Sequence, residues 1–348
     1  MTRYGWLIAI LCSRLLPLAV TARPGATTVS VGKSPVGVAV NPRTNKIYVA
    51  NHRSNDVTLI DGASNATSNL AAGTNPYAVA VNPATNRIYV ANMGSHDVTV
   101  IDGGTNISAT VKVGTNPSAL AVNLDANRIY VTNYGSHDVT VIDGATNATS
   151  RVATGSNPFA ATVNPKTNKV YVANMGSGNV TVIDGASNTT ATVMAGSSPV
   201  AVAVNPVTNR IYVANKDSNN VTVIDGATLR AETVAVGAGP IAVAINSSAN
   251  KIYVANNESD SVTIIDGATD NATTLGSGIG PYAATFDFAT NRIYVLNYYG
   301  GTATVFDGST VVGTIQAGPI PSAAAVNPVT KRIYVTNEYS GKVTVIEE

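Results

Sequence analysis

The chain has 348 residues, of which 12% are charged, and its formal net charge at neutral pH is +1. The charged share is about half that of an average soluble protein, so the chain has no global field to attract nucleic acid or an anionic membrane. Cys12 is the only cysteine, which excludes a disulfide or a thiolate metal site within the chain. Because the composition is uniform beyond the N-terminal segment, we expect one large domain.

The first 22 residues differ from the rest. An apolar run from Trp6 to Cys12 and a second one from Leu15 end at Val20-Thr21-Ala22, a pattern typical of a secretory signal peptide cleaved after Ala22. The alternative is a retained membrane anchor, which needs about 18 to 20 uninterrupted apolar residues, and Arg14 interrupts the run. We therefore predict a signal peptide at residues 1–22 and a mature chain, residues 23–348, with no integral membrane span.

A tripeptide Ile/Val-Tyr-Val recurs through the mature chain with a spacing of 41 residues six times and then 40. A period near 40 residues, built of short strands without a helical apolar rhythm, indicates β-propeller blades. The tyrosines are expected in the core between blades, with strand-end asparagines such as Asn51 and Asn92 as candidate partners for their hydroxyls. The eight tyrosines are Tyr48, Tyr89, Tyr130, Tyr171, Tyr212, Tyr253, Tyr294 and Tyr334.

Each unit contains four predicted strands. In the second unit they span 77–82, 87–92, 98–102 and 109–113, separated by turns that contain Pro, Asn and Gly. The last unit stops after its third strand, while residues 27–31 supply an unpaired strand at the start. We therefore predict an all-β fold, a single closed eight-bladed β-propeller of four-stranded antiparallel blades, in which the N-terminal strand completes the last blade and removes both open edges.

The repeat resembles a known family. Tyr130-Val131-Thr132-Asn133 and its counterpart at 334–337 spell the motif of the YVTN β-propeller repeats, and the Asn-Pro-x-Thr-Asn turn and the Val-Thr-Val-Ile-Asp-Gly strand end match as well. The resemblance covers essentially the whole chain after residue 22. It implies a secreted, periplasmic or surface-layer protein without an assigned catalytic activity. Many members have seven blades, whereas this sequence counts eight.

A basic residue precedes each repeated tripeptide. A ring of eight cations has the composition of a polyanion clamp, but hairpin register places an acidic residue opposite each one, so we favour structural cross-strand ion pairs. The predicted pairs are Lys46 with Asp61, Arg87 with Asp102, Arg128 with Asp143, Lys169 with Asp184, Arg210 with Asp225, Lys251 with Asp266, Arg292 with Asp307, and Arg332 with Glu347.

Catalytic constellations are lacking in the sequence. The three histidines lie in loops of different blades without a thiol or a triad to serve, and the predicted channel wall is Val and Ala, with Asp287 the one acidic exception. The segment 256–260 carries several oxygen ligands but lacks the spacing of a calcium loop, so we interpret it as a solvated turn. We predict no catalytic residue, no metal and no cofactor. The alternative is a metal-assisted lactonase or lyase with its site at the channel mouth.

Loop variability distinguishes the two faces of the predicted propeller. Turns such as 83–86 and 103–106 are nearly copied from blade to blade, and we call their end the copied face; loops such as 51–54 and 297–300 vary, and we call theirs the variable face. Aromatic and basic residues gather in the variable loops, residue types that anchor interfaces, although drift without constraint would also produce variation. The candidate ligand-binding residues are His52, Arg53, Tyr77, His96, Tyr134, His137, Phe159, Lys216, Tyr282, Tyr298, Tyr299 and Tyr339.

These observations predict a monomeric, non-catalytic binding or scaffold propeller in a secreted, periplasmic or cell-surface location. Its expected partner is an envelope polysaccharide or a protein, and no nucleic acid is expected.

Overall fold

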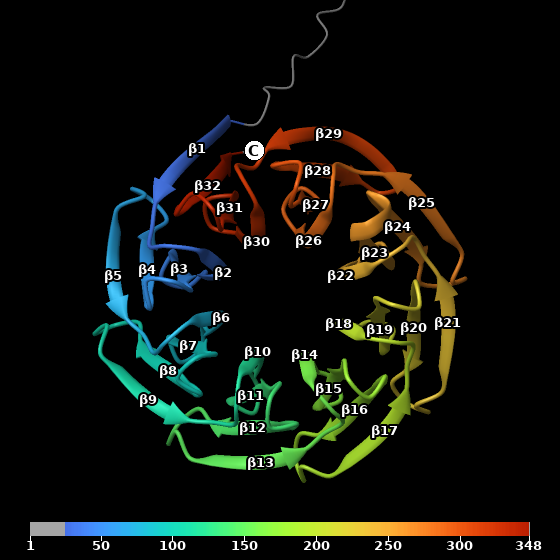
Figure 1. Ribbon diagram of the computed structural model, residues 1–348, viewed down its shortest axis with the longest axis horizontal. Coiled ribbons are helices and arrows are strands. Elements are labelled where there is room, and N and C mark those ends of the chain that lie inside the picture. Colours follow the sequence, from blue (N-terminus) through green and yellow to red (C-terminus); the bar gives the residue numbers. More distant parts are fainter. Residues whose placement is uncertain (1–24, 348) are drawn as a thin grey trace, which may run out of the picture.

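Eight four-stranded antiparallel sheets form a closed ring in the computed structural model, which describes residues 25–347 (Figure 1). The first strand of each blade faces the central channel and the fourth strand lies on the circumference. The eight-bladed propeller is therefore confirmed. The predicted signal peptide lies outside the described residues.

The strands follow the repeat closely. Blades 1 to 4 comprise β2 (Pro35–Asn41), β3 (Lys46–Asn51), β4 (Asp56–Asp61), β5 (Thr67–Ala71); β6 (Pro76–Asn82), β7 (Arg87–Asn92), β8 (Asp97–Asp102), β9 (Ser108–Lys112); β10 (Pro117–Asn123), β11 (Arg128–Asn133), β12 (Asp138–Asp143), β13 (Thr149–Ala153); and β14 (Pro158–Asn164), β15 (Lys169–Asn174), β16 (Asn179–Asp184), β17 (Thr190–Met194). Blades 5 to 8 comprise β18 (Pro199–Asn205), β19 (Arg210–Asn215), β20 (Asn220–Asp225), β21 (Ala231–Ala235); β22 (Pro240–Asn246), β23 (Lys251–Asn256), the 3₁₀ helix η1 (Asn257–Ser259), β24 (Ser261–Asp266), β25 (Ala272–Gly276); β26 (Pro281–Asp287), β27 (Arg292–Asn297), β28 (Thr302–Asp307), β29 (Thr310–Gln316); and β30 (Pro321–Asn327), β31 (Arg332–Asn337), β32 (Lys342–Glu347) with β1 (Gly25–Ser30).

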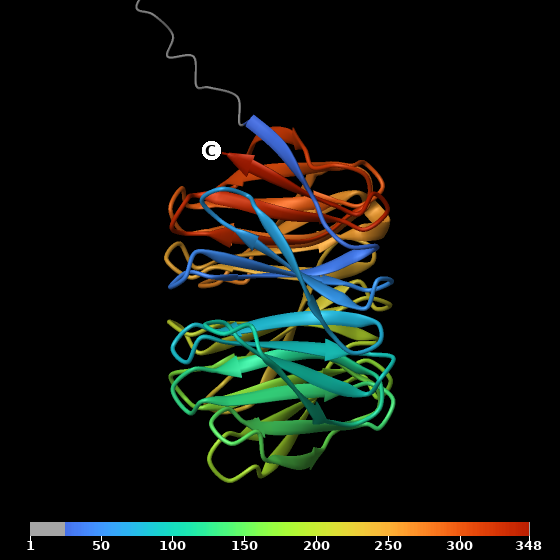
Figure 2. The same ribbon diagram turned by 90° about the vertical axis from the view of Figure 1, so that its left-hand side faces the viewer.

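Blade 8 is closed by the N-terminal strand, as predicted. Its strand order is β1-β32-β31-β30, and β1 runs antiparallel to β32 with Val29 opposite Val343. Figures 1 and 2 show β1 beside the C-terminal strand. Val29 is buried in the cluster that joins blade 8 to blade 1. The closure therefore satisfies the edge of β32 and ties the two ends of the described chain together.

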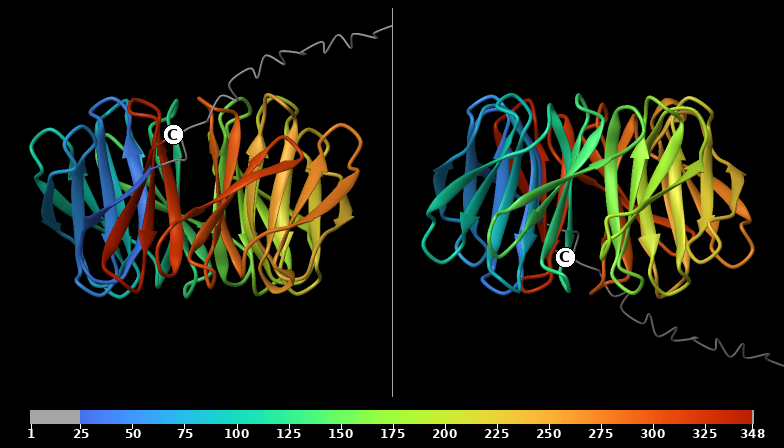
Figure 3. Two further views of the ribbon diagram at one scale, coloured as in Figure 1. Left: turned by 90° about the horizontal axis from the view of Figure 1, so that it is seen from above. Right: turned by 90° about the horizontal axis from the view of Figure 1, so that it is seen from below.

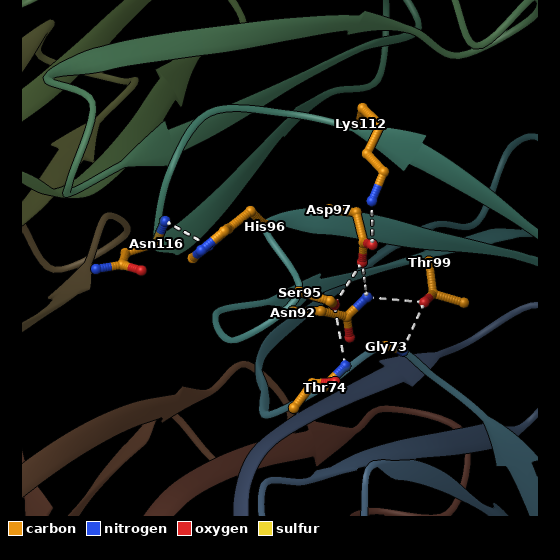
Figure 4. Close-up of polar contacts among 9 residues, drawn as sticks. All are labelled: Gly73, Thr74, Asn92, Ser95, His96, Asp97, Thr99, Lys112 and Asn116. Carbon is orange, nitrogen blue, oxygen red and sulfur yellow. Dashed lines mark hydrogen bonds and ion pairs between the residues drawn. The ribbon is translucent and has the colours of Figure 1, made fainter.

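The repeated tyrosines fill the spaces between blades. Tyr130 of blade 3 is fully buried and belongs to a cluster with Val170 and Ile183 of blade 4, and the other seven are equally buried. The prediction that strand-end asparagines bond the tyrosine hydroxyls is wrong, because these asparagines bond other side chains. Asn92 donates to Asp97 Oδ1 at 2.9 Å and to Thr99 Oγ1 at 2.8 Å (Figure 4). Of the eight repeated tyrosines, Tyr253 donates its hydroxyl to the Gly308 carbonyl of the next blade at 2.7 Å.

The asparagine-to-threonine bond recurs in all eight blades and fixes the start of the third strand. In blade 2, Ser95 Oγ donates to Asp97 at 2.9 Å, and the Thr74 amide of the adjoining loop donates to Ser95 (Figure 4). Buried polar groups require such partners. The small polar residues of the repeat are therefore used within the fold.

Asparagines also join neighbouring blades at the copied face. Asn82 Nδ2 at the end of β6 donates to Oδ1 of Asn127 in the next blade at 2.8 Å, and Asn127 adopts a positive φ of 48°, which asparagine tolerates. The same bond occurs at seven of the eight junctions. At the eighth, the asparagine is replaced by Asp287, which is buried and accepts bonds from the Ala289 amide and the Thr290 hydroxyl.

The cation ring has the predicted register but largely different contacts. Each basic residue lies opposite the acidic residue named above, and Arg332 forms the expected ion pair with Glu347 at 2.8 Å. Arg332 also donates to the Gly62 carbonyl of blade 1 at 3.2 Å. Six other cations reach the next blade in place of their predicted partners. Lys46, Arg87, Arg128, Lys169 and Arg210 donate to the glycine carbonyls at 103, 144, 185, 226 and 267, and Lys251 donates to Ser309 Oγ.

The acidic residues opposite these six cations accept hydrogen bonds within the turns that follow them. Asp143 Oδ1 accepts the Thr146 amide and hydroxyl, each at 2.9 Å, and these bonds lower the pKa of Asp143 more than Arg128 does. The pKa values of Asp61, Asp102, Asp184 and Asp225 are lowered first by the same kind of turn bond, and that of Asp266 by the Ala268 amide. The predicted ion pairs are replaced because a rigid turn amide competes better for an exposed carboxylate than a mobile cation does.

We expect Arg128→Glu and Asp143→Arg to destabilise the protein independently. The first removes an interblade bond to Gly185 and the second removes the acceptor of a turn. A double-mutant cycle by chemical denaturation is therefore expected to show additive effects. Recovery of stability in the double reversal would restore the ion-pair interpretation.

Candidate binding face

Connections between strands gather at two opposite faces of the ring (Figure 3). The copied face carries the turns after the first and third strands, such as 42–45 and 62–66. The variable face carries the loops after the second and fourth strands, such as 52–55 and 72–75. All twelve candidate binding residues lie on the variable face or at the adjoining start of an inner strand.

The residue after the first proline of each inner strand sits in a β-bulge at the variable mouth of the channel. It is small and inward in blades 3 and 8, where Ser118 Oγ lies 2.9 Å from Thr132 Oγ1 and Ser322 Oγ lies at the same distance from Thr336 Oγ1. In the other blades this residue is Val, Ile, Phe or Tyr, and the threonine of the motif is replaced by Ala or Leu. This pairing explains why only two units read Tyr-Val-Thr-Asn.

Large aromatic residues at the mouth pack against variable loops. His52 meets Tyr77 edge-on with ring centroids 6.3 Å apart, and Tyr134 meets Phe159 at 6.3 Å. In blade 7, Tyr282 and Tyr298 lie 4.9 Å apart, and Tyr299 contacts Tyr298 edge-on. The structure therefore brings the predicted aromatic residues together in blades 1–2, 3–4 and 7, and Tyr77 of the first group lies near enough to Tyr282 of the last to raise its pKa.

Two predicted histidines have a structural role. His96 and His137 adopt positive φ values of 57° and 58°. His96 Nδ1 accepts the Asn116 amide at 3.2 Å (Figure 4), and His137 Nδ1 accepts the Asn157 amide at 3.0 Å. Asn55 and Asn219 fill the same position in other blades and make the same bond through Oδ1. These imidazoles substitute for asparagine and tie neighbouring loops, although their outer edges are exposed.

Blades 5 and 6 carry a charged contact on this face. Lys216 Nζ lies 3.8 Å from Glu258 Oε1, and Glu258 belongs to η1. Asp260 Oδ1, at the end of this segment, accepts the Gly280 amide at 2.7 Å. The segment 256–260 is thus a turn with its own bonds. In the described part of the chain, no group of three or more His, Asp or Glu side chains is arranged to hold a metal ion.

A pocket of about 330 Å³ opens on the variable face where the ring closes. We call it the seam pocket, because its residues come from blade 7, from blade 8 and from the loops of blade 1. Predicted residues Arg53, Tyr298 and Tyr339 line it together. Its full lining is Lys33, Ser34, Arg53, Tyr298, Ile320, Glu338, Tyr339, Ser340 and Gly341.

Glu338 is the acidic residue in the lining of the seam pocket. Tyr298 Oη donates to Glu338 Oε2 at 3.2 Å, and Ser34 Oγ lies 3.5 Å from Oε1. Burial raises the pKa of Tyr298, and Glu338 raises it further. Burial, followed by the neighbouring Tyr77, Tyr298 and Glu338, raises the pKa of Tyr282 to about 12. These tyrosines therefore remain protonated hydrogen-bond donors at neutral pH.

Ile320 holds a strained backbone in this pocket. Its φ is 56°, a conformation that a β-branched residue rarely adopts, and the equivalent positions in other blades are Ser, Asn or Gly. Such strain costs of order 1–3 kcal/mol and concentrates at functional sites. We expect Ile320→Asn to raise the free energy of unfolding by about 1 kcal/mol. Urea denaturation measures this change, and a loss of stability would show that the apolar contact of Ile320 outweighs the strain.

Sequence analysis missed Lys33, Ser34, Ile320 and Glu338. The available signal was departure from the repeat. Lys33 is the only charged residue at its loop position, and Glu338 is the only acidic residue directly after a strand-end asparagine.

Comparison with known protein families identifies the family of the chain. The model of the YNCE-like beta-propeller family matches residues 115–309, which is more than half of the chain. The chain belongs to the YNCE-like β-propeller family. This family is related to the YVTN propellers, so the resemblance seen in the repeats holds at the broader level. No curated protein matches the chain.

Two solved structures are similar to this YNCE-like propeller. Kuenenia stuttgartiensis hydrazine synthase is 20% identical with a TM-score of 0.66, and the alignment covers 92% of this chain and 97% of that one. Saccharomyces cerevisiae Sqt1 is 10% identical with a TM-score of 0.81, and the alignment covers 92% and 98%. At these identities, the likeness shows the fold alone.

Proposed function

We propose that the chain is a non-catalytic binding propeller of the cell envelope or the extracellular space. It recognises a polysaccharide or a protein partner through its variable face. The observation that carries this proposal is the seam pocket, where aromatic and charged side chains from three blades converge. Tyrosine and arginine are the side chains that dominate binding energy at interfaces.

Exposed tyrosines surround the pocket. Tyr339 is 83% exposed and lines the pocket, and Tyr299 of blade 7, which packs against the pocket residue Tyr298, is 71% exposed. Their rings offer large contact areas that the fold leaves in solvent. At the copied face, by contrast, the recurrent aspartates and asparagines are used in turns and interblade bonds.

The location and assembly in this proposal rest on the sequence. The segment 1–22 has the pattern of a secretory signal, which supports export. Within the described residues, no helix is long and apolar enough to cross a membrane. We propose that the exported protein acts as a monomer.

We expect Tyr339→Ala to weaken binding to the native envelope fraction about tenfold or more without changing the melting temperature. Tyr339 is exposed, so its removal costs contact area with the partner rather than core packing. Tyr298 is a poorer choice because it packs against Tyr282 and bonds Glu338. Binding is measured by biolayer interferometry on separated polysaccharide and protein fractions.

The matched control is Phe288→Ala. Phe288 is an 81% exposed aromatic residue on the copied face, so its removal changes a similar area at the opposite end of the channel. Unchanged binding in Tyr339→Ala together with lost binding in Phe288→Ala would assign the partner to the copied face.

A further inference from the structure

The charged side chains of two cations in the seam pocket form no hydrogen bond or ion pair within the described residues. Lys33 lies in the loop between β1 and β2, and Arg53 lies in the loop between β3 and β4. Both side chains are exposed, and neither forms a hydrogen bond or an ion pair with residues 25–347. Elsewhere on this face the cation Lys216 has Glu258 beside it. The pocket therefore presents positive charge that the fold does not use.

The acidic side of the pocket is already engaged. Glu338 is held by Tyr298 and lies beside Ser34, so its carboxylate is fixed on the wall shared by blades 7 and 8. The two cations come from blade 1 and from the loop that enters it. The lining thus carries two positive charges, one negative charge and two tyrosine side chains.

The volume of the seam pocket and its open rim limit the size of the ligand that it can hold. A volume of about 330 Å³ is at the low end of the roughly 300–1,000 Å³ typical of ligand pockets. Tyr339 leaves most of its ring in solvent at the rim. A single ring-sized unit fits, while a chain attached to that unit is free to continue across the face.

These features point to a carbohydrate that carries a carboxylate. Arginine and lysine bind carboxylates through charge-assisted hydrogen bonds, an aromatic face packs against the apolar side of a ring, and a fixed carboxylate accepts bonds from hydroxyls. A neutral sugar would leave the cations unused. A protein segment would need a larger surface than one ring-sized pocket, because specific protein interfaces bury about 800 Å² per partner.

We propose that the seam pocket binds one acidic monosaccharide unit, a uronic acid, of an envelope polysaccharide. Lys33 and Arg53 hold its carboxylate, Tyr339 stacks against its ring, and Glu338 accepts its hydroxyls. This inference rests on the proposed function and names its ligand class.

The pocket exists only when the ring is closed. Val31, directly after β1, donates its amide to the Gly341 carbonyl at 3.0 Å, and this bond places the Lys33 loop against the Glu338 loop. The site is therefore assembled from the first and last described parts of the chain, so binding of the sugar is expected to stabilise the closed ring.

The test uses the protein without its predicted signal peptide and three acidic oligosaccharides, namely oligogalacturonate, oligomannuronate and a hyaluronan oligomer. Each is paired with its carboxyl-reduced counterpart, which keeps the backbone and loses the charge. Isothermal titration calorimetry at low and high salt is expected to show that at least one acidic oligomer binds ten times or more tightly than its reduced form. The difference shrinks as salt rises, because the contact is ionic.

Variants then locate the contact. Arg53→Gln and Lys33→Gln are each expected to weaken the acidic oligomer about tenfold, and Arg53→Lys is expected to retain part of the affinity. The matched control is Lys166→Gln, an exposed cation in a copied-face turn far from the pocket, which leaves affinity unchanged. Equal melting temperatures show that each variant is folded.

The outcomes separate this inference from the proposed function. Equal affinity for every acidic oligomer and its reduced form, or binding that survives Arg53→Gln and Lys33→Gln, overturns the uronic-acid assignment. If Tyr339→Ala still loses the envelope partner in that case, the binding face stands. Binding confined to the protein fraction overturns the sugar proposal, and envelope binding that only Phe288→Ala removes overturns both.

Discussion

Deleting residues 25–30 is expected to lower the free energy of unfolding by at least about 3 kcal/mol, because β1 contributes the burial of Val29 and a ladder of hydrogen bonds. The deletion exposes the edge of β32 and opens one side of the cluster between blades 8 and 1. Because both blades depend on this contact, we also expect the unfolding transition to broaden. Thermal and chemical denaturation of the truncated and full-length proteins measure the effect.

A circular permutant is the control for this deletion. It moves residues 25–31 behind Glu347 through a copy of the turn 144–147, which joins the corresponding strands β12 and β13 of blade 3. All eight blades then contain four consecutive strands, and stability is expected to return to the full-length value. A truncated protein that melts like the full-length one would contradict closure by β1, as would a permutant no more stable than the deletion.

Replacing a repeated tyrosine is expected to have a comparable effect. Tyr130→Ala removes a fully buried ring from the cluster between blades 3 and 4, and such aromatic-to-alanine changes cost about 3–5 kcal/mol. Tyr130→Phe keeps the ring and is expected to cost much less. Urea denaturation of both variants distinguishes packing from hydroxyl bonding.

The structural role of Tyr130 differs from the binding role proposed for Tyr339. The eight repeated tyrosines are structural, whereas the exposed tyrosines of the variable loops are available for binding. If Tyr130→Ala left stability unchanged, the core assignment of the repeat would be wrong.

The architecture was predictable because every local signal agreed. The repeated tyrosine gave the period, and the Asn-Pro-x-Thr-Asn turn separated the strands. One unpaired strand at the start and a three-stranded unit at the end required closure. The structure moves the closing strand only from 27–31 to 25–30. Register was predictable for the same reason, since the constant length of the turns between strands leaves one alignment of each hairpin.

Side-chain partners were less predictable, because several acceptors lie within reach of each polar group. Arg128 lies opposite Asp143 but reaches the Gly185 carbonyl of the next blade, and no strand-level pattern encodes that distance across blades. The buried Asn92 was likewise assigned to a tyrosine although Thr99 is its partner. Contacts between blades depend on how the ring packs, which the register of one blade does not determine.

The site was predictable as a face but not as a pocket. Aromatic and basic residues in variable loops identified Arg53, Tyr298 and Tyr339, yet Lys33 and Glu338 come from opposite ends of the chain. Their meeting depends on ring closure. In the sequence, the signal for this pocket is that single residues at these positions differ from the repeat.

Hydrogen–deuterium exchange of the protein with and without its envelope polysaccharide tests the central claim, that the variable face at the seam is the binding site. Bound polysaccharide is expected to slow amide exchange in residues 31–34, 52–55, 319–320 and 338–341, the loops that build the seam pocket. The turns 42–45, 83–86 and 328–331 of the copied face are expected to exchange as in the free protein. Protection confined to those copied-face turns would contradict the account.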